Sequence, residues 1–165
     1  MKAISALALF LCLLTVAAAR PAAAGEGAIQ GRVELKDESG TVRPGMFLKI
    51  FLTREKIPTG PHESLADKKK PEAIDAIISL HVDFYKNLLE KRAMKDFMAG
   101  DAESRADGTF LFERVAPGDY HIVIAFPSMI RTRKVAWQVP VHVKSGKTAH
   151  VTLNGGNMAL PTYRR

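Results

Sequence analysis

After residue 27, most of this chain alternates between apolar and polar positions, which is the pattern of half-buried β-strands. Turn residues such as Ser39-Gly40, Pro117-Gly118 and Ser145-Gly146 separate the alternating segments. The predicted strands lie at residues 29–35, 46–52, 110–112, 120–126, 135–143 and 149–153. Six short strands, each with one apolar face, predict a mainly β protein with an antiparallel, Greek-key β-sandwich.

The stretch between the second and third of these strands has a helical period instead. Pro71 is well placed as the first residue of a helix, and Gly100 as its C-cap. Apolar side chains and one histidine form a stripe at steps of three and four: Ile74, Ile77, Ile78, His81, Phe84, Tyr85, Leu88 and Leu89. The pattern predicts one long helix of roughly 25 residues. We therefore expect a loop and helical insertion over residues 55–103.

The second strand indicates where this apolar stripe packs. If Leu48, Ile50 and Leu52 face the sandwich core, Phe47 and Phe51 face outward, because successive side chains alternate. We expect the helix to lie across this outer face; alternatively, the helix and the exposed patch each bind a partner. The candidate interaction surface comprises the apolar residues on these two faces: Phe47, Phe51, Phe84, Tyr85, Leu88, Leu111 and Val123.

The N-terminus has the three parts of a secretory signal peptide. Lys2 is followed by an apolar run from Ala3 to Val16, which is shorter than the roughly 20 apolar residues of a membrane span. Small residues then offer cleavage after Ala24 or after Ala19. An uncleaved N-terminal anchor is the alternative. We therefore predict a signal peptide at residues 1–24 and a secreted or periplasmic location.

Cleavage after Ala24 would leave a mature chain of 141 residues without any thiol, because Cys12 is the only cysteine. Disulfides, thiolate nucleophiles and cysteine-ligated zinc are then excluded. The loss of Lys2 and Arg20 lowers the formal net charge from +7 to +5. This mild excess suits a soluble domain, with acidic polysaccharide or a membrane surface as possible contacts. Export argues against nucleic acid, and no later apolar run is long enough to span a bilayer.

Candidate catalytic and metal chemistry is sparse. His142 and His150 flank the predicted Ser145-Gly146 hairpin, where a three-residue loop would place them opposite each other and a two-residue loop would not. Two histidines without a third ligand favour a solvated pair over a metal site. The acidic residues of 101–107 lack the spacing of a calcium loop. No common catalytic or phosphate-binding motif occurs, so we predict no enzymatic activity, no metal and no cofactor.

The segment from Asp107 to Tyr120 resembles the central signature of carboxypeptidase regulatory-like domains, which are transthyretin-like β-sandwiches with a carbohydrate-binding-like fold. An Asp-Gly turn precedes a strand there, and a Pro-Gly-x-Tyr sequence opens the next strand. The segment from Ile29 to Val33 resembles the opening strand of that family. The likeness covers residues 28–54 and 104–154, and the insertion departs from the family pattern.

We predict a β-sandwich over residues 25–154, followed by a flexible C-terminal tail at 155–165. The resemblance implies an accessory role in adhesion, carbohydrate contact or protein interaction. We therefore expect an exported, non-catalytic interaction module of the cell envelope, whose partner is an envelope protein or a polysaccharide. A carbohydrate-binding module is the alternative. Sugar binding needs exposed aromatic rings, whereas the alternation around Trp137 places that side chain in the core.

Overall fold

The computed structural model describes residues 25–37, 39–61 and 71–164. The predicted signal peptide at 1–24 lies outside these residues. In the described part the helix is α1 (Pro71–Arg92). The strands, in chain order, are β1 (Gly27–Lys36), β2 (Val42–Pro44), β3 (Lys49–Thr53), β4 (Met98–Glu103), β5 (Thr109–Val115), β6 (Gly118–Ile124), β7 (Met129–Ile130), β8 (Arg133–Lys134), β9 (Trp137–Val143), β10 (Thr148–Leu153) and β11 (Tyr163–Arg164).

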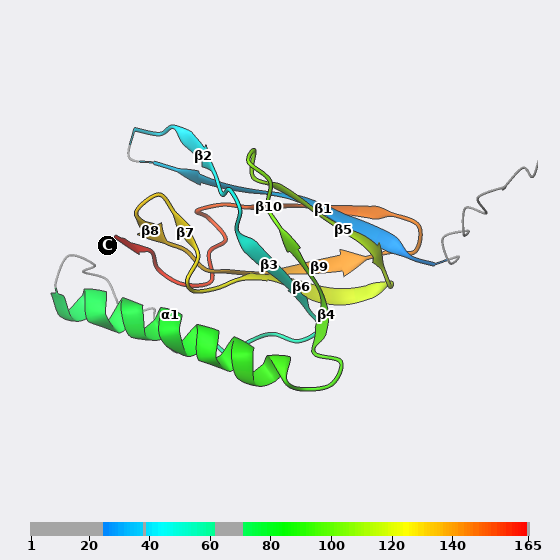
Figure 1. Cartoon of the computed structure of the whole chain (residues 1–165), viewed down its shortest axis with the longest axis horizontal. Coiled ribbons are helices and arrows are strands. Elements are labelled where there is room, and N and C mark those ends of the chain that lie inside the picture. The colour runs from blue at the N-terminus through cyan, green and yellow to red at the C-terminus, as the bar shows by residue number, and fades with distance from the viewer. Residues whose placement is uncertain (1–24, 38, 62–70, 165) are drawn as a thin grey trace, which may run out of the picture.

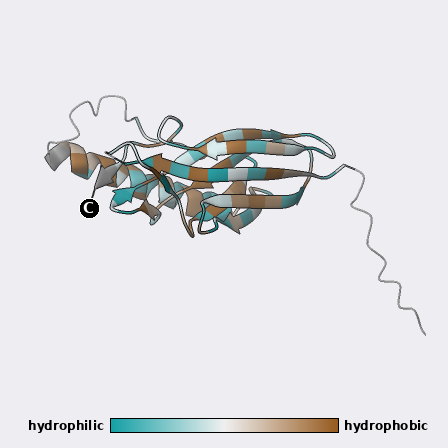
Figure 2. Ribbon diagram, turned by 90° about the horizontal axis from the view of Figure 1, so that it is seen from above, coloured by the Kyte–Doolittle hydropathy of each residue, from teal (hydrophilic) through white to brown (hydrophobic). Residues whose placement is uncertain are grey.

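Two main sheets stack face to face and enclose the core (Figure 1). One has the order β4-β3-β6-β9; in the other, β1 lies between β10 and β5, and β2 pairs with the end of β1. The apolar side chains of both sheets meet between them, including Ile29, Phe110, Ile122 and Trp137. Apolar and polar residues alternate along the strands (Figure 2). The prediction of a mainly β protein with antiparallel sheets and one helix is confirmed at this level.

The β9–β10 connection departs from the predicted hairpin. β9 pairs with β6 in one sheet, whereas β10 pairs with β1 in the other sheet, and that pairing is parallel. The chain around Ser145-Gly146 therefore crosses from one sheet to the other. Alternation identified both strands correctly, but it carries no information about which neighbour each strand takes.

The Asp-Gly and Pro-Gly-x-Tyr turns behave as their residues predict. Gly108 has a φ of 82°, and its carbonyl accepts a hydrogen bond from the Val33 amide at 2.8 Å. The ring of Tyr120 is buried, and its hydroxyl donates to the Ala116 carbonyl at 2.8 Å. These turns fix the start of β5 and of β6.

The helix lies on the outer face of the β4-β3-β6-β9 sheet (Figure 1). It begins at Pro71, as predicted, but it ends at Arg92, earlier than the Gly100 C-cap would place it. Phe97 turns into the core, and residues 98–103 form β4, which pairs with β3. The expectation that the helix continues toward Gly100 is therefore wrong for this segment, because pairing with β3 decides its conformation.

The end of the chain was expected to be a flexible tail, but the structure packs it against the sandwich and the helix. Leu160 is buried, and the Ala159 amide donates to the Ala136 carbonyl at 3.0 Å. His81 Nε2 of α1 lies 2.9 Å from the Pro161 carbonyl, and β11 pairs with β8. In the part of the chain that the structure describes, no helix has the length and apolar character of a membrane span.

Candidate anion-binding site

The predicted interaction surface divides into two groups. Phe84, Leu88 and Val123 are buried in the interface between α1 and its sheet, and Phe51 and Tyr85 pack against them. These five side chains hold the helix on the sandwich and leave no apolar stripe for a partner. Phe47 and Leu111 lie elsewhere and are 66% and 39% exposed. The expectation that all the outward-facing residues form one helix-covered patch is therefore wrong for these two.

The two candidate metal histidines lie in different sheets, His142 on β9 and His150 on β10. His142 Nδ1 lies 2.7 Å from Asp119 Oδ1, and His150 is opposite Gln30 of β1. The predicted hairpin was the only reason to pair them, and it does not form. Across residues 25–37, 39–61 and 71–164, no three His, Cys, Asp or Glu side chains gather as metal ligands would.

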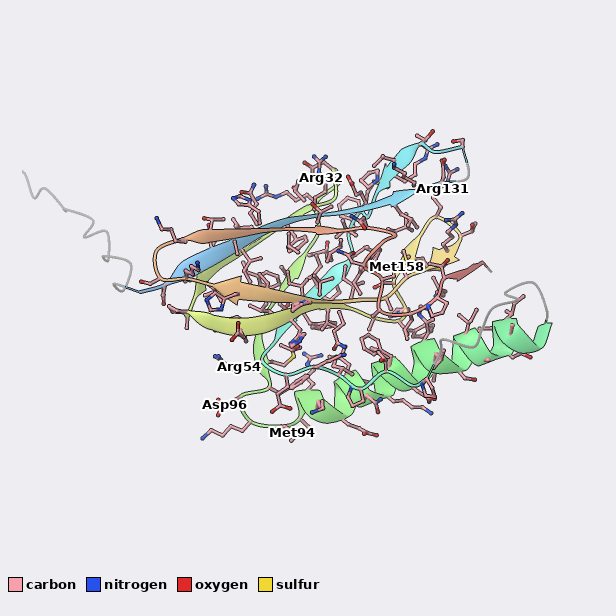
Figure 3. All side chains as sticks on the ribbon, turned by 180° about the vertical axis from the view of Figure 1, so that it is seen from behind. Arg32, Arg54, Met94, Asp96, Arg131 and Met158 are labelled. Carbon is pink, nitrogen blue, oxygen red and sulfur yellow. The ribbon has the colours of Figure 1, made fainter. Side chains whose placement is uncertain are left out.

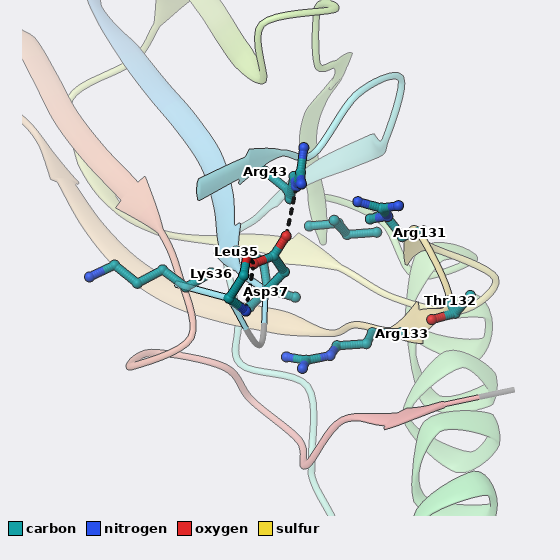
Figure 4. A pocket seen from close by; sticks show the side chains of 9 residues that line it. Leu35, Lys36, Asp37, Arg43, Arg131, Thr132 and Arg133 are labelled. Carbon is teal, nitrogen blue, oxygen red and sulfur yellow. Dashed lines mark hydrogen bonds and ion pairs between the residues drawn. The ribbon is translucent and has the colours of Figure 1, made fainter. Parts of the chain in front are cut away.

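Cationic side chains converge at the end of the sandwich formed by β1, β2 and the β7–β8 hairpin. They line a pocket of about 250 Å³ together with Leu35 and Ile130 (Figure 4). The cations are Lys36, Arg43, Arg131 and Arg133. They come from three strands and a turn that lie up to 97 residues apart in the chain. Only tertiary folding brings them together.

Among the described residues that line the pocket, Asp37 supplies the one carboxylate, and it is already engaged. Asp37 Oδ2 accepts a hydrogen bond from Arg43 Nε at 2.8 Å, while Oδ1 accepts from the Ser39 hydroxyl and from the amides of Ser39 and Thr41. The Ser39 hydroxyl first, and then the Arg43 guanidinium, hold the pKa of Asp37 well below its usual range. Asp37 therefore stays ionised and organises the β1–β2 turn, and Lys36 and Arg131 bring further positive charge to the pocket.

The β7–β8 hairpin holds Arg131 in an uncommon conformation. Ile130 pairs with Arg133, so that Arg131 and Thr132 form a two-residue turn. Arg131 has a φ of 56°, the left-handed region that glycine or asparagine usually occupies. Its side chain is exposed at the tip of the hairpin (Figure 3). Strained residues of this kind concentrate at functional sites, because the surrounding fold must maintain them.

Two further hollows continue from this pocket. One, of about 540 Å³, shares Leu35, Lys36 and Arg133 with it and extends along the polar residues 154–156. The other, of about 350 Å³, shares Arg43, Ile130 and Arg131 and extends to Pro44, Met46 and Met129. The three hollows lie next to one another at this end and share lining residues, and we call them together the end groove. It is polar at one end, cationic in the middle and apolar at the other end.

Sequence reasoning missed this site for an identifiable reason. The cations are scattered, and each one alone looks like an ordinary surface residue. The densest local signal is the run from Arg131 to Lys134, in which three of four residues are basic. No glycine or asparagine marks the turn at Arg131, so the hairpin that presents this run was not predicted.

Comparisons with known proteins identify no family. No family model matches the chain, and no curated protein matches it. The similar solved structures include a Pseudomonas aeruginosa protein proposed to bind carbohydrate, at 17% identity and a TM-score of 0.47, which covers 79% of this chain and 89% of that one. The minor pilin of Streptococcus agalactiae gives 14% identity and a TM-score of 0.47, over 86% of this chain but only 48% of the pilin. The resemblance to carboxypeptidase regulatory-like domains thus remains a prediction.

Proposed function

We propose that this chain is a non-catalytic β-sandwich interaction module of the cell envelope that binds an anionic ligand in the end groove. The single observation that carries the proposal is the pocket whose described lining brings four cations together with one carboxylate, which Arg43 already neutralises. A carboxylate, phosphate or sulfate group is the ligand that guanidinium and ammonium donors fit best.

The rest of the molecule supports a binding role over catalysis. The residues that the structure describes along the end groove include no histidine, and their carboxylates are those of Asp37 and Glu34. Asp37 is held ionised by its hydrogen bonds, so it is a poor general acid. The lining therefore offers hydrogen-bond donors and positive charge, which suit recognition of a ligand more than its chemical conversion.

Export and family membership belong to the same proposal. The signal-like N-terminus would deliver the module to the periplasm or the cell surface, where acidic polysaccharides and envelope proteins are the available anionic partners. The Asp-Gly and Pro-Gly-x-Tyr turns support a carboxypeptidase regulatory-like domain with the helix as an insertion. A carbohydrate-binding module remains the alternative within this proposal, and an acidic sugar would satisfy both descriptions.

The proposal is tested by removing charge at the groove and at the opposite end of the molecule. The variant Lys36→Ala/Arg131→Ala neutralises two exposed groove cations, and Lys144→Ala/Lys147→Ala neutralises two exposed cations of the β9–β10 connection. Both variants lower the net charge equally. The mature protein is applied to heparin-agarose, and the salt concentration at elution is measured.

We expect the groove variant to elute at clearly lower salt and to bind heparin about tenfold or more weakly, because each charge-assisted hydrogen bond contributes about 1.5–3 kcal/mol. The β9–β10 variant should elute close to the unaltered protein. Equal shifts in the two variants would mean that only the net charge matters, and the proposed site would then be wrong.

A further inference from the structure

Among the described residues, Phe47 is the one aromatic that combines an exposed side chain with a left-handed backbone. Its side chain is 66% exposed, and it is the one aromatic among the exposed large apolar side chains of the described residues. Its φ of 54° lies in the left-handed region, which is unfavourable for a bulky residue. A glycine here would remove both the strain and the exposed ring.

The fold holds Phe47 in this position with buried hydrogen bonds. The Phe47 amide donates to the Ser104 carbonyl at 3.0 Å, and the next amide, that of Leu48, donates to Ser104 Oγ at 2.8 Å. Ser104 Oγ in turn donates to the Gly45 carbonyl at 2.6 Å. Ser104 is 1% exposed, and Leu48 anchors the loop in the core. These hydrogen bonds and the buried Leu48 side chain therefore hold the loop between β2 and β3 in one conformation, in which the Phe47 ring is exposed.

Phe47 directly follows a residue of the end groove. Met46 lines the apolar end of that groove together with Arg43 and Arg131, whereas Phe47 itself lines none of the three hollows. Consecutive Cα atoms are 3.8 Å apart, so a polymer that leaves the groove at Met46 meets the Phe47 loop within one residue.

We propose that Phe47 is a stacking platform for a sugar ring, and that the ligand is an acidic polysaccharide whose carboxylate groups bind in the cationic middle of the end groove. This inference rests on the proposed function and specifies its ligand. A pyranose has an apolar C–H face, which packs on an aromatic ring, and hydroxyl groups at its edge. The polar end of the groove, with Asn154 and Thr162, can hydrogen-bond the hydroxyls of other sugar units of the same chain.

The shape of the site favours a glycan chain over a lipid surface. Three neighbouring hollows suit the successive units of an extended polymer, whereas insertion into a bilayer needs a broad convex apolar surface. The apolar contribution here is one ring and the short Met46 segment.

The test compares acid sugars of increasing length with variants of Phe47. Binding of galacturonic acid, its trimer and its hexamer is measured by calorimetry for the unaltered protein, Phe47→Tyr and Phe47→Gly. We expect the hexamer to bind at least tenfold more tightly than the monomer. Phe47→Tyr should keep that gain, and Phe47→Gly should lose most of it. Met94→Ala removes another exposed apolar side chain, at the end of α1, and should change nothing.

The melting temperature of Phe47→Gly distinguishes a loss of binding from a loss of stability. Glycine relieves the left-handed conformation, so the melting temperature of Phe47→Gly should stay level or rise by a few degrees while its binding falls. A lower melting temperature together with weaker binding would make Phe47 a structural residue and overturn the inference.

Two further outcomes keep the two proposals apart. If monomer and hexamer bind equally tightly, and Lys36→Ala/Arg131→Ala weakens both, the anion site stands and the polysaccharide is wrong. If no acid sugar binds and heparin retention is unaffected by the groove variant, the proposed function itself fails. Binding to phosphatidylglycerol vesicles in place of the hexamer would assign the groove to lipid and would also overturn the inference.

Discussion

Gly108 shows how much of this fold depends on single backbone positions. A Cβ atom on Gly108 would lie 2.5 Å from the Val33 carbonyl oxygen, and the residue has a φ of 82°. Gly40 has nearly the same φ, 80°, but a Cβ there meets nothing within 4 Å. The two glycines therefore separate the cost of strain from the cost of a steric clash.

We expect Gly108→Ala to lower the free energy of unfolding by about 2–4 kcal/mol, since it adds a backbone clash to the left-handed strain. Gly40→Ala carries the strain alone and should cost about 1 kcal/mol. Urea unfolding followed by circular dichroism gives both values. Equal losses would mean that the β4–β5 turn moves aside and that its contact with β1 is not rigid.

At the scale of elements, α1 depends on the side chains that it buries against the sheet. Phe84 is 1% exposed and packs in the cluster that includes Val123 and Leu160, whereas Leu89 is 44% exposed. The helix has only 22 residues and a mixed sequence, so we expect its stability to come from this packing and not from intrinsic helix propensity.

The expected outcome is that Phe84→Ala lowers the free energy of unfolding by about 3–5 kcal/mol, the usual range for truncating a buried aromatic side chain. Leu89→Ala on the same helix should change it by less than about 0.5 kcal/mol. Urea denaturation measures both. A small effect of Phe84→Ala would show that the helix is loosely attached and free to bind elsewhere.

The sequence predicted elements with a strong internal pattern and missed those that depend on a neighbour. Alternation located β6 and β9 and assigned Trp137 to the core, where its indole donates to the Asn154 carbonyl at 2.8 Å. The segment 98–103 has little alternation and no β-branched residue, so its pairing with β3 could not be predicted. The candidate site was missed for the same reason, because Lys36 and Arg131 meet only in the folded chain.

At the scale of the whole molecule, acid should destabilise the protein in two separate ranges of pH. Burial is the main cause that lowers the pKa of His81 and of His121. The nearby Lys134 charge also lowers the pKa of His81, whereas the Pro161 carbonyl raises it. The unfolded chain therefore takes up these protons first, from about pH 6.5 downward, and stability falls over that range.

The second range arises from two aspartates and lies below about pH 4. The largest cause that lowers the pKa of Asp37 is its hydrogen bond from the Ser39 hydroxyl, and for Asp107 it is the hydrogen bond from the Thr109 hydroxyl. The stabilising effect of these two carboxylates is lost as they protonate.

The melting temperature measured from pH 8 to pH 3 should fall in two steps. The variant His81→Gln/His121→Gln should flatten only the upper step, and Asp37→Asn/Asp107→Asn only the lower one. A single step that neither variant alters would mean that general charge repulsion, and not these four residues, controls acid stability.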